Sequence, residues 1–157
     1  MDAKIGIKPK LLAKAAYELS KVLADEFVLY TKTRNAHWNV TGPDFHAVHE
    51  FFEEQYEALD DAVDEIAERI RALGHYAPAT LKEYLKLTAL SEQTREKNTS
   101  QGFFKQLLRD HESLIIRLRG CIKIFADEFN DAGTSDFITS LMEKHEKMAW
   151  MLRSHLE

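Results

Sequence analysis

The chain has 157 residues, 45% of them hydrophobic, and a formal net charge of −5. The length suits one domain with a sizeable core, and the negative charge argues against a simple nucleic-acid binder. The single cysteine, Cys121, cannot form an intrachain disulfide, and neither an apolar leader nor a bilayer-spanning run is present, so we expect a cytoplasmic protein without a membrane partner.

Apolar residues at helical spacing predict two long helices in the first half of the chain. The first is expected over Pro9–Trp38, because Gly42 and Pro43 then act as stop signals. The second is expected over Asp44–Leu73, with Gly74 as its terminator. The predicted stripes are Leu12, Ala16, Leu19, Leu23, Phe27 and Tyr30 in the first helix, and Phe45, Val48, Phe52, Leu59, Val63, Ile66 and Ile70 in the second.

A connection of about 25 residues follows, which is long for a compact domain. A short helix is predicted within it over Thr80–Leu87, since Thr80 and Glu83 fit a capping box. Three of its side chains are expected to pack inward, namely Leu81, Tyr84 and Leu85.

The second half of the chain predicts two further long helices, over Thr99–Phe129 and from Thr134 to the C-terminus. Short links force antiparallel neighbours, whereas the long crossover lets the second and third long helices run parallel. This connectivity is that of an all-α, ferritin-like four-helix bundle with a short helix in the crossover between helices two and three. We expect a single domain over residues 1–157, with residues 1–8 as a short N-terminal tail.

The residues that most clearly suggest chemistry lie in the first two helices. His37 belongs to the first, and His49 with Glu53 and Asp64 with Glu68 form two i,i+4 pairs on the second. Histidine and carboxylate together suit divalent iron or zinc. At a rise of ~1.5 Å per residue, one continuous helix places His49 and Asp64 roughly 22 Å apart, whereas metal–ligand bonds are only about 2 Å long. The two halves are therefore either unrelated surface groups or parts of a site shared by two copies.

Each of these residues also has a plainer interpretation. Asp64 and Glu68, with Asp60 and Asp61, are typical of a solvated acidic face, and a lone histidine such as His49 is more often a capping or hydrogen-bonded residue. The Glu-x-x-His pairs that ligate metal inside ferritin-like di-iron bundles do not occur in the sequence. A metal inside one subunit's bundle is therefore not expected, and a metal site needs another location.

Two sequence runs together resemble the Dps family, the small dodecameric ferritins. The run from His37 to His49 reads HWNVTGPDFHAVH, and Asp60–Arg69 reads DDAVDEIAER. The first run and its separation from Asp-x-x-x-Glu are specific to the family, and the length and helix layout fit over essentially the whole chain.

The resemblance implies a homododecamer with ferroxidase sites at its two-fold dimer interfaces. One subunit would contribute His37 and His49, and the other would contribute Asp64 and Glu68. Glu53 stands where the family often has aspartate, one methylene shorter, and is the fifth candidate ligand. The family oxidises Fe(II), preferably with hydrogen peroxide, and stores the Fe(III) mineral in its cavity; zinc is a possible substitute in such a site.

Further acidic residues are candidates for iron entry and for nucleation of the mineral. Glu50, Glu54 and Glu57 lie near one another on the second helix and are proposed to nucleate mineral, with simple solubility as the alternative. By resemblance, the acidic junction between the last two long helices surrounds a three-fold pore, with Asp131 and Asp136 as entry residues. The alternative for Asp136 is a favourable charge at a helix N-terminus.

The main functional alternative is a DNA-compacting protein of the nucleoid with secondary iron chemistry. The first ten residues contain Lys4, Lys8 and Lys10 but also Asp2, and the C-terminus has no basic extension. Twelve copies would still offer many phosphate contacts. DNA binding is thus possible but not favoured, and a third alternative is a helical interaction module without metal.

Overall fold

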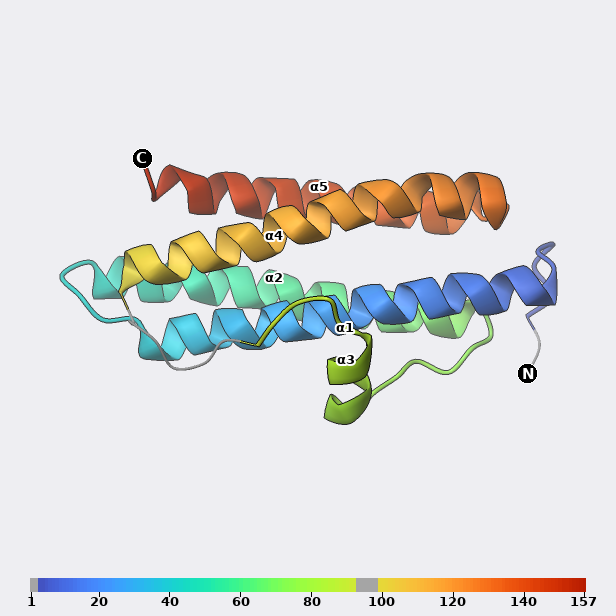
Figure 1. Ribbon diagram of the computed structural model, residues 1–157, viewed down its shortest axis with the longest axis horizontal. Helices are drawn as coiled ribbons and strands as arrows, with labels where there is room; N and C mark the ends of the chain where they lie inside the picture. The colour runs from blue at the N-terminus through green and yellow to red at the C-terminus, as the bar shows by residue number, and fades with distance from the viewer. Residues whose placement is uncertain (1–2, 93–98) are drawn as a thin grey trace.

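The computed structural model describes residues 3–92 and 99–157, which form an all-helical bundle (Figure 1). Within these residues the only β pairing is an isolated bridge between Thr41 and Thr99. The predicted fold class is confirmed. The elements are α1 (Pro9–Asn39), α2 (Phe45–Ala72), α3 (Leu81–Leu87), α4 (Ser100–Lys123), the π-helix η1 (Ile124–Glu128) and α5 (Ala132–Ser154).

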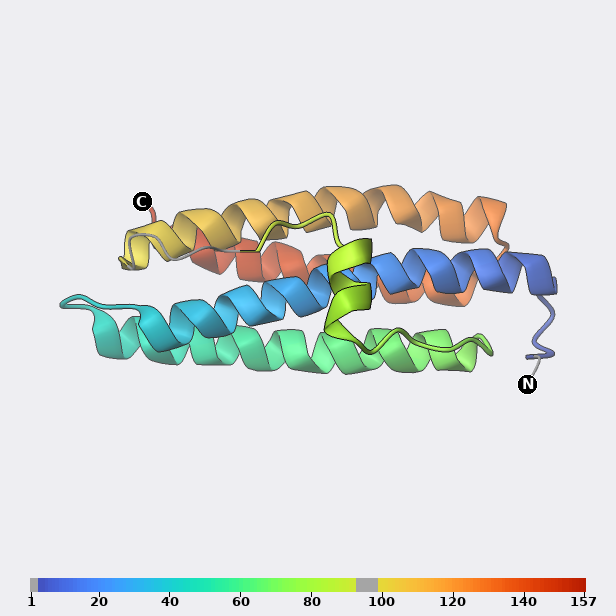
Figure 2. The ribbon, with the colours of Figure 1, turned by 60° about the horizontal axis from the view of Figure 1, so that its bottom comes forward.

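The four long helices lie as two antiparallel pairs, α1 with α2 and α4 with α5 (Figures 1 and 2). The chain returns from the end of α2 by way of α3, which packs across the outside of α1 (Figure 2). Helices α2 and α4 therefore start at the same end of the bundle and run parallel, as the long crossover predicts.

Local signals explain where the helices begin. Pro9 occupies the first turn of α1, where its missing N–H costs nothing. Thr80 and Thr99 accept hydrogen bonds from the amides of the third residue inside α3 and α4, and Asp131 does the same for α5. The capping box at Thr80 is therefore confirmed on the threonine side.

The core lies between the four long helices and contains most of the predicted stripes. Fully buried members include Leu19, Leu23, Phe52, Leu59 and Phe103. The prediction of burial is wrong for three residues of the isolated chain, because the exposed fractions of Phe45, Leu81 and Leu85 are 45%, 68% and 50%.

The predicted third long helix also requires a correction. The α-helical part ends at Lys123, and η1 then carries the chain to Glu128 with a wider hydrogen bond, from the amide of Phe129 to the carbonyl of Ile124 five residues earlier. Phe125 and Phe129 remain buried and meet edge to face, at 5.6 Å between ring centroids. None of the helices in the described parts of the chain is both long enough and apolar enough to cross a membrane.

Candidate metal centre

The candidate centre lies where α1 ends and α2 begins. His37 is in the last turns of α1, and His49 is in the second turn of α2. The turn between the two helices brings the imidazoles together with their centroids 3.7 Å apart and their planes 21° from parallel. His37 is 7% exposed and His49 is half-buried.

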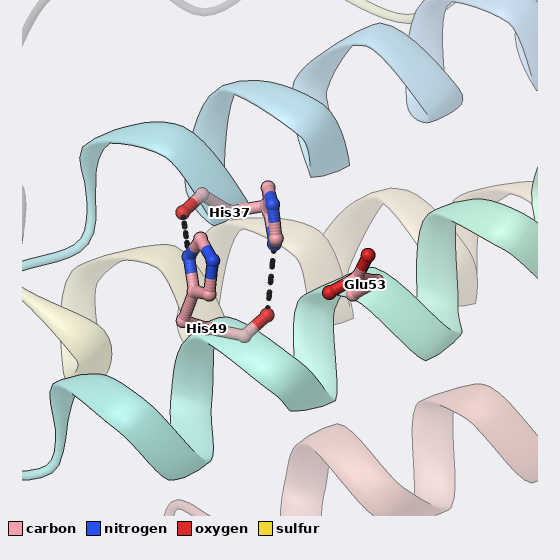
Figure 3. Close-up of side chains that lie close together, drawn as sticks. All are labelled: His37, His49 and Glu53. Carbon is pink, nitrogen blue, oxygen red and sulfur yellow. Dashed lines mark hydrogen bonds between the residues drawn. The ribbon is translucent and has the colours of Figure 1, made fainter.

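Each imidazole is held by the backbone of the opposite helix. His37 Nδ1 lies 2.8 Å from the carbonyl oxygen of His49, and His49 Nδ1 lies 2.8 Å from the carbonyl oxygen of His37 (Figure 3). A carbonyl can only accept, so Nδ1 is the donor in both rings. In a neutral imidazole the lone pair is then on Nε2, which is the form that binds metal.

Glu53 completes a group of three potential ligands. It is one turn after His49 on α2 and is half-buried. One ligand atom from each of His37, His49 and Glu53 lies within 4.8 Å of the others, and no other such group occurs within residues 3–92 and 99–157. Figure 3 shows the three side chains on the two facing helices. Two imidazoles and one carboxylate form a set that suits divalent iron or zinc, although zinc sites commonly need a fourth ligand.

The other two predicted ligands lie elsewhere on the same helix. Asp64 and Glu68 are both exposed, and α2 runs without interruption from His49 past both of them. Fifteen residues of helix correspond to about 22 Å between the levels of His49 and Asp64. Within one subunit the structure thus brings three of the five predicted ligands together and leaves two apart.

Tyr56, which the sequence reasoning did not assign, contacts two of the candidate ligands. The hydroxyl of Tyr56 donates to Glu53 Oε1 at 3.3 Å, and its ring meets that of His37 edge-on at 5.2 Å between centroids. The guanidinium carbon of Arg34 lies 4.4 Å from the ring centroid of Tyr56 and 5.0 Å from that of Trp38. The i,i+3 spacing of Glu53 and Tyr56 was a usable signal, since such residues meet on a helix.

A second pair of histidines lies in the middle of the bundle. His145 Nε2 is 2.6 Å from Glu26 Oε1, and His145 Nδ1 is 2.9 Å from His111 Nδ1. All three side chains are at most 1% exposed, and Glu26 Oε2 has no hydrogen-bond partner among the described residues. Burial and the neighbouring His145 hold the pKa of His111 well below its usual 6.5.

The predicted pore residues differ in their surroundings. Asp131 is 3% exposed, accepts from the amide of Thr134 at 2.9 Å and pairs with Arg69 at 3.2 Å. Its carboxylate therefore caps α5 and is neutralised within the subunit. Asp136 is exposed, as are Asp127 and Glu128 of η1.

The proposed nucleation residues Glu50, Glu54 and Glu57 are all exposed on α2. Glu54 lines a groove between α2 and α5 that also contains Asp61, Glu65 and Lys144. Glu50 instead lies 3.5 Å from the ring of His46. Glu57 does not line this groove.

Comparison with known proteins gives the family. The model of the ferritin-like domain matches residues 17–157. "DNA protection during starvation protein 2" of Bacillus anthracis is 41% identical over 138 residues, covering 88% of this chain and 93% of the relative. An "uncharacterized low temperature-induced protein" of Nostoc sp. is 45% identical over 139 residues, covering 88% and 78%.

Solved structures agree with these sequence matches. The Dps protein of Vibrio cholerae O1, described as a member of a broad superfamily of ferritin-like diiron-carboxylate proteins, superposes with a TM-score of 0.93 at 31% identity, covering 99% of this chain and 97% of that one. Antigen TpF1 of Treponema pallidum gives a TM-score of 0.89 at 35% identity, covering 99% of both chains. The chain therefore belongs to the ferritin-like family and, within it, to the Dps proteins.

Proposed function

We propose that this protein oxidises Fe(II), preferably with hydrogen peroxide, at sites shared by two subunits and stores the Fe(III) product inside a homododecamer. One observation carries the proposal: the reciprocal hydrogen bonds of His37 and His49 leave both Nε2 atoms for a cation beside Glu53. We place the activity in the cytoplasm, in keeping with the free thiol of Cys121.

The missing carboxylates are supplied by a second copy in this proposal. Asp64 and Glu68 are too far along α2 to reach the imidazoles of their own subunit, but they are exposed and free to meet those of a partner. In a two-fold dimer each subunit gives its imidazoles to one site and its carboxylates to the other.

Apolar side chains on the surface of α1 and α3 also support a dimer. Leu81 and Leu85 of α3 line a groove together with Phe27 and Val28 of α1. Trp38, beside the candidate ligand His37, is 63% exposed. Large apolar side chains left in solvent are typical of surfaces that another protein covers.

The ligand set also favours the proposed reaction. Carboxylates stabilise Fe(III) more than Fe(II), so adding two of them to the imidazoles and Glu53 favours loss of an electron. Two Fe(II) ions release one electron each, the O–O bond of hydrogen peroxide breaks, and two protons complete two water molecules. Two irons close together therefore reduce the peroxide without releasing a hydroxyl radical.

Iron entry and deposition are assigned to exposed carboxylates. We propose entry past Asp136, with Asp131 fixing the loop that carries it through its cap and its pair with Arg69. Mineral nucleation is assigned to Glu50, Glu54 and Glu57, of which Glu54 lies in the groove between α2 and α5.

A complementation experiment tests the shared site. One variant carries His37→Ala and His49→Ala, and the other carries Asp64→Ala and Glu68→Ala. Each alone should fail to oxidise Fe(II) on addition of stoichiometric peroxide. Coexpressed subunits should regain activity, because about one site in four then receives both intact halves at an isologous interface.

Asp61→Ala, an exposed neighbour on α2, serves as the control and should oxidise Fe(II) at the normal initial rate. Mixed particles without activity would contradict the shared site.

DNA binding is a second candidate function, since relatives are named for DNA protection during starvation and Lys4, Lys8 and Lys10 are exposed. A gel shift at low and physiological salt tests it. Binding that weakens with salt and is lost when the three lysines become glutamine would support it. Lack of retardation at both salt concentrations would exclude it.

A further inference from the structure

Glu53 is the candidate ligand whose position most needs an explanation. Its side chain has more rotatable bonds than an aspartate, and fixing them near a metal costs conformational entropy. His37 and His49 are fixed by backbone carbonyls, whereas the carboxylate of Glu53 accepts a hydrogen bond from the hydroxyl of Tyr56, at 3.3 Å to Oε1.

Tyr56 is itself held in place by α1. Arg34 lies over its ring at 4.4 Å, and the same guanidinium donates to the hydroxyl of Tyr30 at 2.7 Å. The rings of Tyr30 and Tyr56 meet edge to face at 6.2 Å, and Tyr56 also touches His37 edge-on. The phenol is therefore anchored on one helix and packed against another before any metal binds.

The phenol is also in the correct protonation state to act as a donor. An ordinary tyrosine hydroxyl has a pKa of about 10 and is protonated at neutral pH. The hydroxyl therefore keeps its proton at neutral pH and donates to the carboxylate.

We propose that Tyr56 is a positioning residue that holds Glu53 against the metal bound by His37 and His49. This inference rests on the proposed function. The hydroxyl engages one oxygen of Glu53 and leaves the other for the cation. Because a supporting partner of a metal ligand commonly contributes 10- to 100-fold in metal affinity, removing the hydroxyl should have a measurable effect.

The test is anaerobic binding of Co²⁺ to the assembled protein, followed by its visible absorption. Tyr56→Phe removes only the hydroxyl and keeps the ring, so a role limited to packing predicts no change. We expect Tyr56→Phe to bind Co²⁺ roughly tenfold more weakly, which is the effect on metal affinity typical of a residue that supports a metal ligand, and to have an altered absorption spectrum. Tyr76→Phe is the matched control, since Tyr76 is 79% exposed, and it should bind Co²⁺ as the unaltered protein does.

Double variants separate positioning from a general disturbance. Glu53→Gln should weaken Co²⁺ binding, and adding Tyr56→Phe to it should cause no further loss, because the two residues act through one contact. Additive losses, or an unchanged affinity in Tyr56→Phe, would overturn the positioning role.

If His37→Ala and Asp64→Ala impair iron oxidation while Tyr56→Phe leaves Co²⁺ binding intact, the positioning role alone fails. If neither His37→Ala nor Asp64→Ala impairs iron oxidation, the proposed function fails.

Discussion

The part of the chain that the structure describes contains two close pairs of histidines, and only one of these is built like a metal site. In the His37–His49 pair, both Nδ1 atoms bond to backbone carbonyls, so both Nε2 atoms remain for a ligand at a partly open helix junction. In the His111–His145 pair, the imidazoles bond to each other and His145 also bonds to Glu26 in the closed core. A candidate metal site therefore differs from a buried hydrogen-bond network in the partners of the ring nitrogens. The short distance between two histidines does not by itself distinguish the two cases.

The largest effect is expected in the core network. His145→Ala would leave Glu26 buried without its hydrogen-bond partner, and breaking a buried pair in this way costs about 3–5 kcal/mol of unfolding free energy. Urea unfolding at fixed protein concentration would measure the loss. A triple variant in which Glu26, His111 and His145 are all replaced by leucine should lose far less unfolding free energy, because no buried polar group is then left without a partner. A loss below about 1 kcal/mol for His145→Ala would show that the network contributes little.

The open pair should control activity instead. His49→Ala removes a proposed ligand and its hydrogen bond, so iron oxidation should slow by more than roughly 100-fold, which corresponds to about 2.7 kcal/mol. His111→Gln should leave the rate per folded subunit within about twofold, because His111 lies outside the centre. Initial Fe(III) absorbance after addition of peroxide provides the rate. Equal losses in both variants would remove the distinction between the pairs.

His111 of the buried pair should also make the stability of the fold depend on pH. The pKa of His111 is well below 6.5 in the folded chain, so the unfolded chain binds more protons as the pH falls. The contribution of His111 to stability should then be nearly complete at pH 7.5 and decrease as the pH falls through 6.5, by at most about 1.4 kcal/mol between pH 7.5 and 5.5. Urea midpoints at the two pH values would measure this decrease. His111→Gln, which cannot titrate, should show a decrease smaller by that amount; an unchanged dependence would contradict the assignment.

The smallest effect is expected at His46, a histidine outside both pairs. His46 lies 3.5 Å from Glu50, but its side chain is 84% exposed. An exposed pair contributes little, so His46→Ala should change the unfolding free energy by less than about 0.5 kcal/mol. The urea midpoint and the initial oxidation rate of this variant should both match those of the unaltered protein. A clear loss of rate would extend the centre beyond His37, His49 and Glu53.

Local sequence signals could predict much of the fold and half of the centre. Apolar periodicity and the stop signals at Gly42 and Pro43 predicted α1 and α2, and the turn between them places His37 near His49. Spacing along α2 also separated Asp64 from His49 correctly, because helix rise is nearly constant.

The remaining features depend on contacts between distant parts of the chain. Glu26, His111 and His145 come from three helices and are up to 119 residues apart, so they form no local pattern. The exposure of Leu81 follows from where α3 lies on α1, which helical spacing does not determine. The π-helix after Lys123 likewise leaves no clear mark in the apolar stripe.

The bond from His49 to the carbonyl of His37 has a consequence for how helix α1 ends. The last four carbonyls of an α-helix have no donor within the helix, and α1 ends only two residues after His37. The imidazole of His49 therefore acts as a side-chain cap for the neighbouring helix. A carboxylate or a thiolate could replace it as a metal ligand, but neither has an N–H to donate. Histidine at this position thus supports the end of α1 in addition to its proposed role as a metal ligand.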